Sequence, residues 1–353
     1  MKLRRDHMKI TIKEIAKLAG VSPGTVSKVL NNYHDVGEET KKKVLEIMEQ
    51  TGYVAARIQK DTAHKSRVVG VIYAGEINAD FNHPFFIEVM NSFKKTMGTF
   101  GYDLLFFSNE QFEEGEEDYY ERAMRYKVDG VIIISGEKVQ PSIYRLDMSD
   151  IPCIGVDIPL EGNRSAYIMT DNYKVSAKVV EHFYLCGYRH IGYIGGLAGA
   201  QVTKIREQGF RNTMKEFGLT IHEEWFAQGD FFMESGYEAM KKILGSSHYP
   251  EAVFAASDLM AFGAMKAVKE HGLKIPEDIA IVGCDDIDAC NYTDPPLTSV
   301  RQDKEKIGRL AAYMLRDIIH RQFQPKTVMV EPELIIRKSC GSNRLYGLMS
   351  GKM

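Results

Sequence analysis

Several polar residues lie directly after predicted strands, and their side chains can bind a small polar molecule. Asp157, Ser257 and Asp285 each follow a short apolar run typical of a buried strand. In open parallel sheets, ligands bind beyond the carboxyl ends of the strands. A carboxylate accepts hydrogen bonds from hydroxyl groups, and a guanidinium such as that of Arg206 donates to two neighbouring oxygens. These residues predict a site for a polyol, such as a sugar or a related metabolite.

His83 and Phe85 belong to the same predicted site, because they open the helix that follows the first strand. A histidine can donate to a ligand oxygen, and its charge changes near neutral pH. The alternative for His83 is a helix N-terminal residue with no ligand role. For Arg206 and Asp285, the alternative is a salt bridge between lobes or on a helix surface.

The N-terminal region contains the capping residues of two short helices joined by a tight turn. Thr11 and Glu14 have the T-x-x-E spacing of a capping box. Gly20 allows the positive φ that ends the first helix. Ser22 is a preferred N-cap, and Pro23 a preferred first-turn residue, for the second helix. This pattern predicts a helix-turn-helix.

A helix-turn-helix places the N-terminal part of its second helix in the major groove of DNA. The apolar faces of the two helices are predicted to be Ile15, Leu18 and Ala19, then Val26, Val29 and Leu30. Thr25 and Lys28 are the best candidates to read base edges, whereas Ser22 and Ser27 suit phosphate contacts. All candidate DNA-contacting residues are Thr11, Ser22, Pro23, Gly24, Thr25, Ser27, Lys28, Asn31, Arg57 and Lys60.

Basic residues are concentrated near the N-terminus. Residues 1–67 contain 14 Lys and Arg but 8 Asp and Glu, a net charge of +6. The whole chain carries −3, so residues 68–353 carry −9. Such asymmetry is expected when only one end of a protein meets the phosphates of nucleic acid.

Beyond the N-terminal region, apolar segments alternate with amphipathic helices from Val68 onward. This alternation predicts an α/β fold with parallel sheets covered by helices, and two successive runs of it predict two lobes. The predicted organisation is an extension at 1–9, a helix-turn-helix domain at 10–54, a hinge or linker at 55–67, a two-lobed domain at 68–338 (lobe 1 about 68–160 and 291–330, lobe 2 about 163–288) and a tail at 339–353.

Composition limits the class of protein further. The chain has 353 residues and no apolar run near the roughly 18 residues of a membrane span. Its basic N-terminus lacks the apolar core of a signal peptide. The five cysteines are scattered without metal-ligand spacing. We therefore expect a cytoplasmic protein with no membrane partner, metal or cofactor.

The segment T-I-K-E-I-A-K-L-A-G-V-S-P-G-T-V-S-K-V-L-N at 11–31, with Gly52-Tyr53, resembles the DNA-binding domain of the LacI/GalR family of bacterial transcription regulators. The resemblance extends to about residue 337. It implies a homodimeric repressor that binds an approximately palindromic operator. It also implies that a small-molecule effector enters a periplasmic-binding-protein-like domain and changes the operator affinity.

The same resemblance suggests roles for three residues of the predicted site. Arg206 and Asp285 match the arginine and aspartate that bind effectors in the family, and Phe231 matches an aromatic residue that stacks on the ligand. Core packing is the alternative role for Phe231. His83 stands where the family often has asparagine.

Two further positions depart from the family pattern. Thr62 stands where the family usually has a leucine that inserts into the DNA minor groove. Because threonine is shorter and polar, we expect weaker bending of the operator. Lys28 stands where the family commonly has arginine, and lysine discriminates less between bases than a bidentate guanidinium does.

Two other classes of protein share a two-lobed α/β domain. An enzyme is disfavoured because the sequence has no G-x-G-x-x-G, G-x-x-x-x-G-K-[ST], H-E-x-x-H or G-x-S-x-G motif, and no residue is assigned a catalytic role. An exported solute-binding protein is disfavoured by the helix-turn-helix and by the missing signal-peptide pattern.

Overall fold

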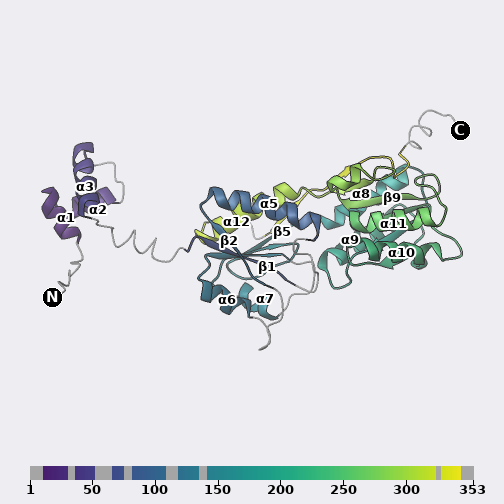
Figure 1. Ribbon diagram of the computed structural model, residues 1–353, viewed down its shortest axis with the longest axis horizontal. Helices are drawn as coiled ribbons and strands as arrows, with labels where there is room; N and C mark the ends of the chain where they lie inside the picture. The colour runs from purple at the N-terminus through teal and green to yellow at the C-terminus, as the bar shows by residue number, and fades with distance from the viewer. Residues whose placement is uncertain are drawn as a thin grey trace, which may run out of the picture. The chain divides into compact units, whose positions relative to one another are not determined.

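The computed structural model describes residues 11–30, 36–51, 66–74, 82–108, 118–134, 141–322 and 327–342. The chain divides into two compact units, Met1–Ser66 and Arg67–Met353 (Figure 1). The first unit contains the helices near the N-terminus, and the second contains both sheets. The α/β fold with an N-terminal helix-turn-helix is confirmed.

The first unit contains the helices α1 (Ile12–Ala19), α2 (Pro23–Leu30) and α3 (Glu38–Thr51). The predicted capping box is present, since Thr11 accepts from the Glu14 amide and the Glu14 carboxylate accepts from the Thr11 amide. Gly20 ends α1 with a φ of 69°. The three helices enclose a small core, formed by Ile15, Ala16, Ala19, Val26, Val29, Val44 and Met48.

Leu18 is not part of this core, contrary to the prediction, and its exposed fraction is 58%. A helix turns about 100° per residue, so Ile15, Ala16 and Ala19 share one face. Leu18 lies about 100° away from the middle of that face. Val26 and Val29 of α2 are buried, as predicted, and the side chain of Leu30 lies outside the described ones.

The first sheet of the second unit defines lobe 1. Its strands run in the order β11-β5-β4-β3-β1-β2, and all of its neighbouring strands are parallel. Helices α5 (Pro84–Thr99) and α12 (Lys304–Ile319) cover one face, and α6 (Tyr119–Tyr126) and α7 (Pro141–Asp147) cover the other (Figure 1). The strands are β1 (Val68–Tyr73), β2 (Asp103–Phe106), β3 (Gly130–Ile134), β4 (Cys153–Val156), β5 (Ser165–Thr170) and β11 (Thr327–Val330).

The second sheet defines lobe 2, with the order β12-β10-β9-β8-β6-β7. Only β12 is antiparallel to its neighbour within this described sheet. The strands are β6 (Ile191–Gly195), β7 (Phe226–Gln228), β8 (Ala252–Ala255), β9 (Ala280–Asp285), β10 (Thr298–Arg301) and β12 (Glu333–Ile335). The helices pack in two pairs, α8 (Asn172–Leu185) with α9 (Gln201–Glu216) and α10 (Met233–Leu244) with α11 (Asp258–Glu270), and two short 3-10 helices lie at η1 (Glu223–Trp225) and η2 (Asp288–Asn291).

The chain crosses between the lobes three times: after β5, between β10 and α12, and between β11 and β12. The predicted lobe boundaries therefore need correction. Residues 163–170 were expected in lobe 2, but β5 pairs with β4 and β11 of lobe 1. Residues 291–301 were expected in lobe 1, but β10 pairs with β9 of lobe 2. Each of these strands pairs with the strand just before it and with a later strand that the chain reaches only after changing lobes. The local apolar pattern does not reveal where those changes occur.

All five cysteines are buried free thiols. Buried thiols pack as small apolar groups, which agrees with their scattered positions. None of the helices in the described ranges has the length and apolar character needed to span a bilayer.

Candidate functional site

The start of α2 presents the side chains predicted to contact DNA. Ser22, Pro23, Gly24 and Lys28 are exposed, while Thr25 is half-buried. Ser22 caps the helix, because its Oγ accepts from the Thr25 amide at 3.0 Å. Its Oγ also lies 2.9 Å from the Thr25 Oγ1. The cap fixes the orientation of the helix start that a DNA groove would receive.

The structure describes only some of the other residues predicted to contact DNA. Thr11 is exposed at the start of α1, and Ser27 is half-buried on α2. Asn31, Arg57 and Lys60 lie outside the described residues, as does Thr62 of the predicted hinge. The roles of all these residues stay predictions.

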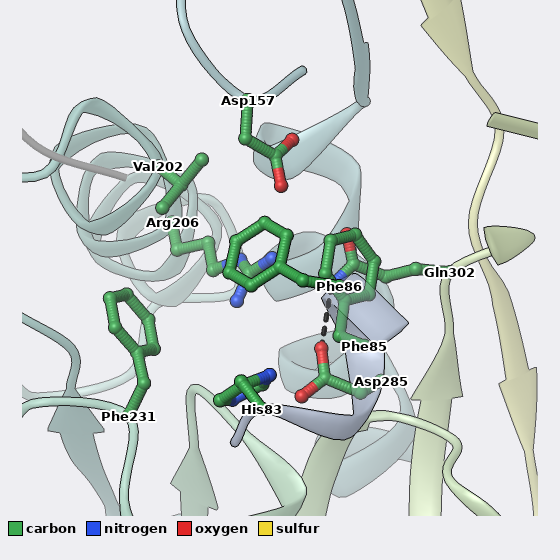
Figure 2. Close-up of a pocket in the computed structure, with 9 residues that line it drawn as sticks. All are labelled: His83, Phe85, Phe86, Asp157, Val202, Arg206, Phe231, Asp285 and Gln302. Atoms are coloured by element: carbon green, nitrogen blue, oxygen red, sulfur yellow. Dashed lines mark hydrogen bonds between the residues drawn. The ribbon is translucent and has the colours of Figure 1, made fainter. Parts of the chain in front are cut away.

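The second unit has a pocket between its two lobes, of about 410 Å³ with its mouth included (Figure 2). Six of the seven predicted effector residues lie in its wall, and Ser257 does not. The lining residues are His83, Phe85, Phe86, Asp157, Val202, Arg206, Phe231, Asp285 and Gln302.

Both lobes and one crossover contribute to this wall. Lobe 1 supplies the start of α5 and Asp157, which follows β4. Lobe 2 supplies two residues of α9, Phe231 before α10, and Asp285 at the end of β9. Gln302 lies on the crossover between β10 and α12. A molecule in the pocket would therefore contact both lobes at once.

Arg206 is held in place before any ligand binds. Its Nε donates to Asn172 Oδ1 at 2.7 Å, and its Nη1 donates to the Ala256 carbonyl oxygen at 2.6 Å. Asn172 is fixed in turn, because its Nδ2 donates to the Thr170 carbonyl oxygen at 2.9 Å. These bonds use two of the five N–H donors of the guanidinium. The positive charge is thus oriented in a buried wall.

The acidic side chains of the pocket differ in their partners. Asp285 Oδ1 accepts from Gln302 Nε2 at 2.7 Å, the dashed bond in Figure 2. Asp157 Oδ1 has no hydrogen-bond partner among the described residues. Burial raises the pKa of Asp157 to about 7, with Arg206 opposing the rise and Asp285 adding to it. Asp157 therefore changes charge near neutral pH.

His83 is a second buried polar group whose hydrogen bonds are unfilled. Neither ring nitrogen makes a hydrogen bond of ordinary geometry among the described residues, although the Phe231 backbone approaches the ring and acts to raise its pKa. Burial lowers the pKa of His83, so the neutral ring, with one donor and one acceptor nitrogen, is favoured. Buried polar atoms are nearly always hydrogen-bonded. His83 and Asp157 are consequently groups that a ligand would satisfy.

The backbone is strained at three pocket residues. Asp157, Phe231 and Asp285 have φ angles of 57°, 75° and 122°. Residues other than glycine rarely adopt positive φ, and such strain is concentrated at functional sites. The strain supports a functional role for these three positions.

Ser257 does not line the pocket, contrary to the prediction. Its Oγ accepts from the Met260 amide at 3.2 Å, so it is the N-cap of α11. The same Oγ donates to the Phe231 carbonyl oxygen at 3.0 Å. A serine that follows a strand and precedes a helix is a preferred N-cap, which explains the difference. Ser257 supports the strained backbone of Phe231 from behind the pocket wall.

Three lining residues were not predicted: Phe86, Val202 and Gln302. Val202 precedes Arg206 by one helical turn, so helical spacing would have placed both on one face. Phe86 is adjacent to the predicted Phe85. Gln302 directly follows β10, and only the recognition of that strand would have revealed it.

Comparison with known proteins identifies both parts of the chain. Residues 11–55 match the family described as bacterial regulatory proteins, lacI family, and residues 180–340 match the periplasmic binding protein-like domain. The HTH-type transcriptional repressor PurR of Pasteurella multocida (strain Pm70) is 32% identical over 335 residues, covering 94% of this chain and 99% of that protein. PurR of Haemophilus influenzae (strain ATCC 51907 / DSM 11121 / KW20 / Rd) is 33% identical over 338 residues, covering 94% and 99%.

Solved structures show the same fold. The complex of the transcriptional regulator CelR with cellobiose has a TM-score of 0.70 and 29% identity, covering 94% of this chain and 99% of that one. The lac repressor dimer bound to operator and the anti-inducer ONPF has a TM-score of 0.68 over 94% and 99% of the two chains. At 22% identity, the latter supports the fold alone.

The capped helix-turn-helix, the two-lobed α/β unit and full-length likeness to repressors lead to one conclusion. The PurR relatives cover nearly the whole chain, and they are transcriptional repressors by name. The chain belongs to the lacI family of bacterial regulatory proteins and is a DNA-binding transcriptional repressor, not an enzyme.

Proposed function

We propose that this repressor binds an approximately palindromic operator as a homodimer in the cytoplasm, and that a small molecule in the interlobe pocket changes its operator affinity. The observation that carries the proposal is that both lobes supply polar groups to one pocket. A ligand that contacts both lobes favours one lobe arrangement over others. Coupling between two such sites is typically about 1–3 kcal/mol and is reciprocal.

On the DNA side, we propose that the start of α2 reads one half-site in the major groove. Thr25 and Lys28 are the proposed base readers, and the exposed lysines of the first unit would neutralise phosphates. Phosphate contacts release counterions, so the operator affinity should fall steeply with salt.

For the effector, we propose an uncharged polyol such as a sugar. Arg206 is the one arginine or lysine among the nine lining residues, and it faces the acidic groups Asp157 and Asp285. A phosphate or carboxylate on the ligand would add negative charge beside these groups. Hydroxyl groups instead suit carboxylate acceptors, and the phenylalanine rings can cover the apolar face of a sugar. The related CelR structure is a cellobiose complex.

The DNA part of the proposal is tested by selecting bound sequences from a random library at low and near-physiological salt. A two-fold symmetric consensus that persists at the higher salt supports a dimer with sequence specificity. Binding that disappears with salt and leaves no consensus would contradict it.

The effector part is tested by thermal shift with a panel of neutral sugars, sugar phosphates and planar nucleobases. A sugar that raises the melting temperature of the wild type and not that of Asp285→Asn, and that alters affinity for the selected operator, supports the proposal. A response to nucleobases alone would assign the pocket to planar heterocycles. A response to sugar phosphates would refute the charge argument.

A further inference from the structure

Lys304 links the two lobes beside the pocket. It is the first residue of α12, directly after the chain has crossed from lobe 2 to lobe 1, and its side chain is 7% exposed. Its Nζ donates to the carbonyl oxygens of Asp285 at 2.7 Å and Asp286 at 2.9 Å. Both acceptors lie at the carboxyl end of β9 in lobe 2. A lobe 1 helix thus binds the backbone that carries the pocket carboxylate.

On its other side, the ammonium group of Lys304 approaches Glu88 of α5. The Nζ lies 3.6 Å from Glu88 Oε2, and the Glu88 side chain is 50% exposed. Burial raises the pKa of Glu88, Lys304 lowers it, and the lobe 2 carboxylates Asp288 and Asp285 raise it further. Lys304 therefore lies among negative groups that belong to different lobes, and its charge compensates their repulsion.

The backbone that Lys304 holds is unfavourable in itself. Asp285 and Asp286 have φ angles of 122° and 52°, in the region that favours glycine. Strained residues persist only when their surroundings hold them. Ser299 Oγ accepts from the Asp286 amide at 3.0 Å, and Lys304 supplies a donor to both carbonyl oxygens. The direction of the Asp285 carboxylate thus depends on contacts from both lobes.

We infer that Lys304 is a positioning residue that holds the two lobes together at β9 and directs the Asp285 carboxylate into the pocket. The consequence for effector binding rests on the function proposed above, whereas the contact between the lobes requires no ligand. Replacing Lys304 with methionine keeps an unbranched side chain, one atom shorter, but removes its charge and donors. Glu88 would then face Asp285 and Asp288 without a counter-ion, and the lobes should separate.

The test measures the distance between the lobes in the full-length protein without ligand, by electron paramagnetic resonance. Nitroxides are attached at Met124→Cys on α6 of lobe 1 and at Lys242→Cys on α10 of lobe 2. The five native cysteines are buried and compete poorly for the label. Excess unlabelled protein restricts the signal to distances within one chain.

We expect Lys304→Met to broaden the distance distribution and change its mean, whereas Lys306→Met leaves it unchanged. Lys306 is an exposed lysine two residues further along α12, so its variant removes the same charge. Adding Glu88→Gln to Lys304→Met should partly restore the wild-type distribution, because it removes the lobe 1 carboxylate. High salt should also reduce the change, because the Glu88 side chain is half exposed and its repulsion is screened.

Circular dichroism checks that each variant is folded. If Lys304→Met does not fold, Lys304→Gln carries the same expectation, since it also lacks the charge. A folded Lys304 variant with the wild-type distribution would overturn the inference. A change that Glu88→Gln does not reduce would also overturn it, because loss of packing alone would then explain the result. None of these outcomes depends on the identity of the effector.

Discussion

The first unit and the pocket of the second are built in different ways. The helices of the first unit lie between Thr11 and Thr51, and their caps join residues three positions apart. The pocket brings together residues from His83 to Gln302, across two sheets and a crossover. The proposed DNA-reading surface thus depends on local structure, whereas the pocket depends on the packing of segments distant in sequence. Mutations should therefore affect the two functions separately.

The largest effect is expected in the pocket, from Arg206→Met. Removing one partner from a buried group of charges costs about 3–5 kcal/mol, because the remaining charges are left uncompensated. Calorimetry should show a lower melting temperature for the second unit alone. Arg211→Met on the same helix removes a partly exposed ion pair with Glu223 and serves as the control. Equal effects of the two variants would show that Arg206 has no special role.

In the first unit, Ile15→Ala should abolish operator binding. Ile15 is fully buried in the small core, and truncating a buried isoleucine costs about 2–5 kcal/mol. We expect the melting of the second unit to stay unchanged in calorimetry, while binding to the selected operator is lost. Leu18→Ala, at an exposed position of the same helix, should retain binding. If Ile15→Ala lowers both melting transitions equally, the two units do not fold separately.

A smaller effect is expected from Lys28→Ala, which tests specificity without disturbing the core. If Lys28 reads a base edge, the variant loses roughly 1–3 kcal/mol on the selected operator and much less on a sequence altered at the contacted base. Binding titrations on both sequences measure the difference. A uniform loss on every sequence would instead assign Lys28 to a phosphate.

A pH dependence of stability is expected in the second unit. Because the pKa of Asp157 is raised to about 7, the folded protein keeps a proton that the unfolded chain loses near pH 4. Stability should therefore fall as pH rises from about 4 to 7, by at most about 1.4 kcal/mol per pH unit for one group. Burial also raises the pKa of Asp258 to about 7, so this residue contributes in the same window.

The variant Asp157→Asn separates the two contributions. It lacks the proton of Asp157 but retains that of Asp258, so its melting temperature relative to the wild type should increase between pH 5 and pH 8. A constant difference across this range would show that Asp157 titrates at its ordinary pKa.

Much of the fold was predictable because its signals are local. Thr11, Gly20 and Ser22 marked the helix ends correctly. The apolar strands before Asp157 and Asp285 correctly indicated an edge where polar groups meet. Leu18 was predicted wrongly because its spacing from Ile15 is helical, yet its side chain lies about 100° from the middle of the buried face. Ser257 was placed wrongly because a residue after a strand can equally cap the next helix.

The amino-acid sequence alone is enough to predict the helix-turn-helix, the α/β class and most of the polar groups at the strand ends. These depend on backbone conformations and side-chain periods that neighbouring residues impose on one another. Three features are visible only in the tertiary structure: β5 lies in lobe 1 and β10 in lobe 2, Gln302 lies in the pocket wall, and Lys304 reaches the end of β9. These features depend on where the chain crosses between the lobes and on contacts between separate segments, neither of which neighbouring residues reveal.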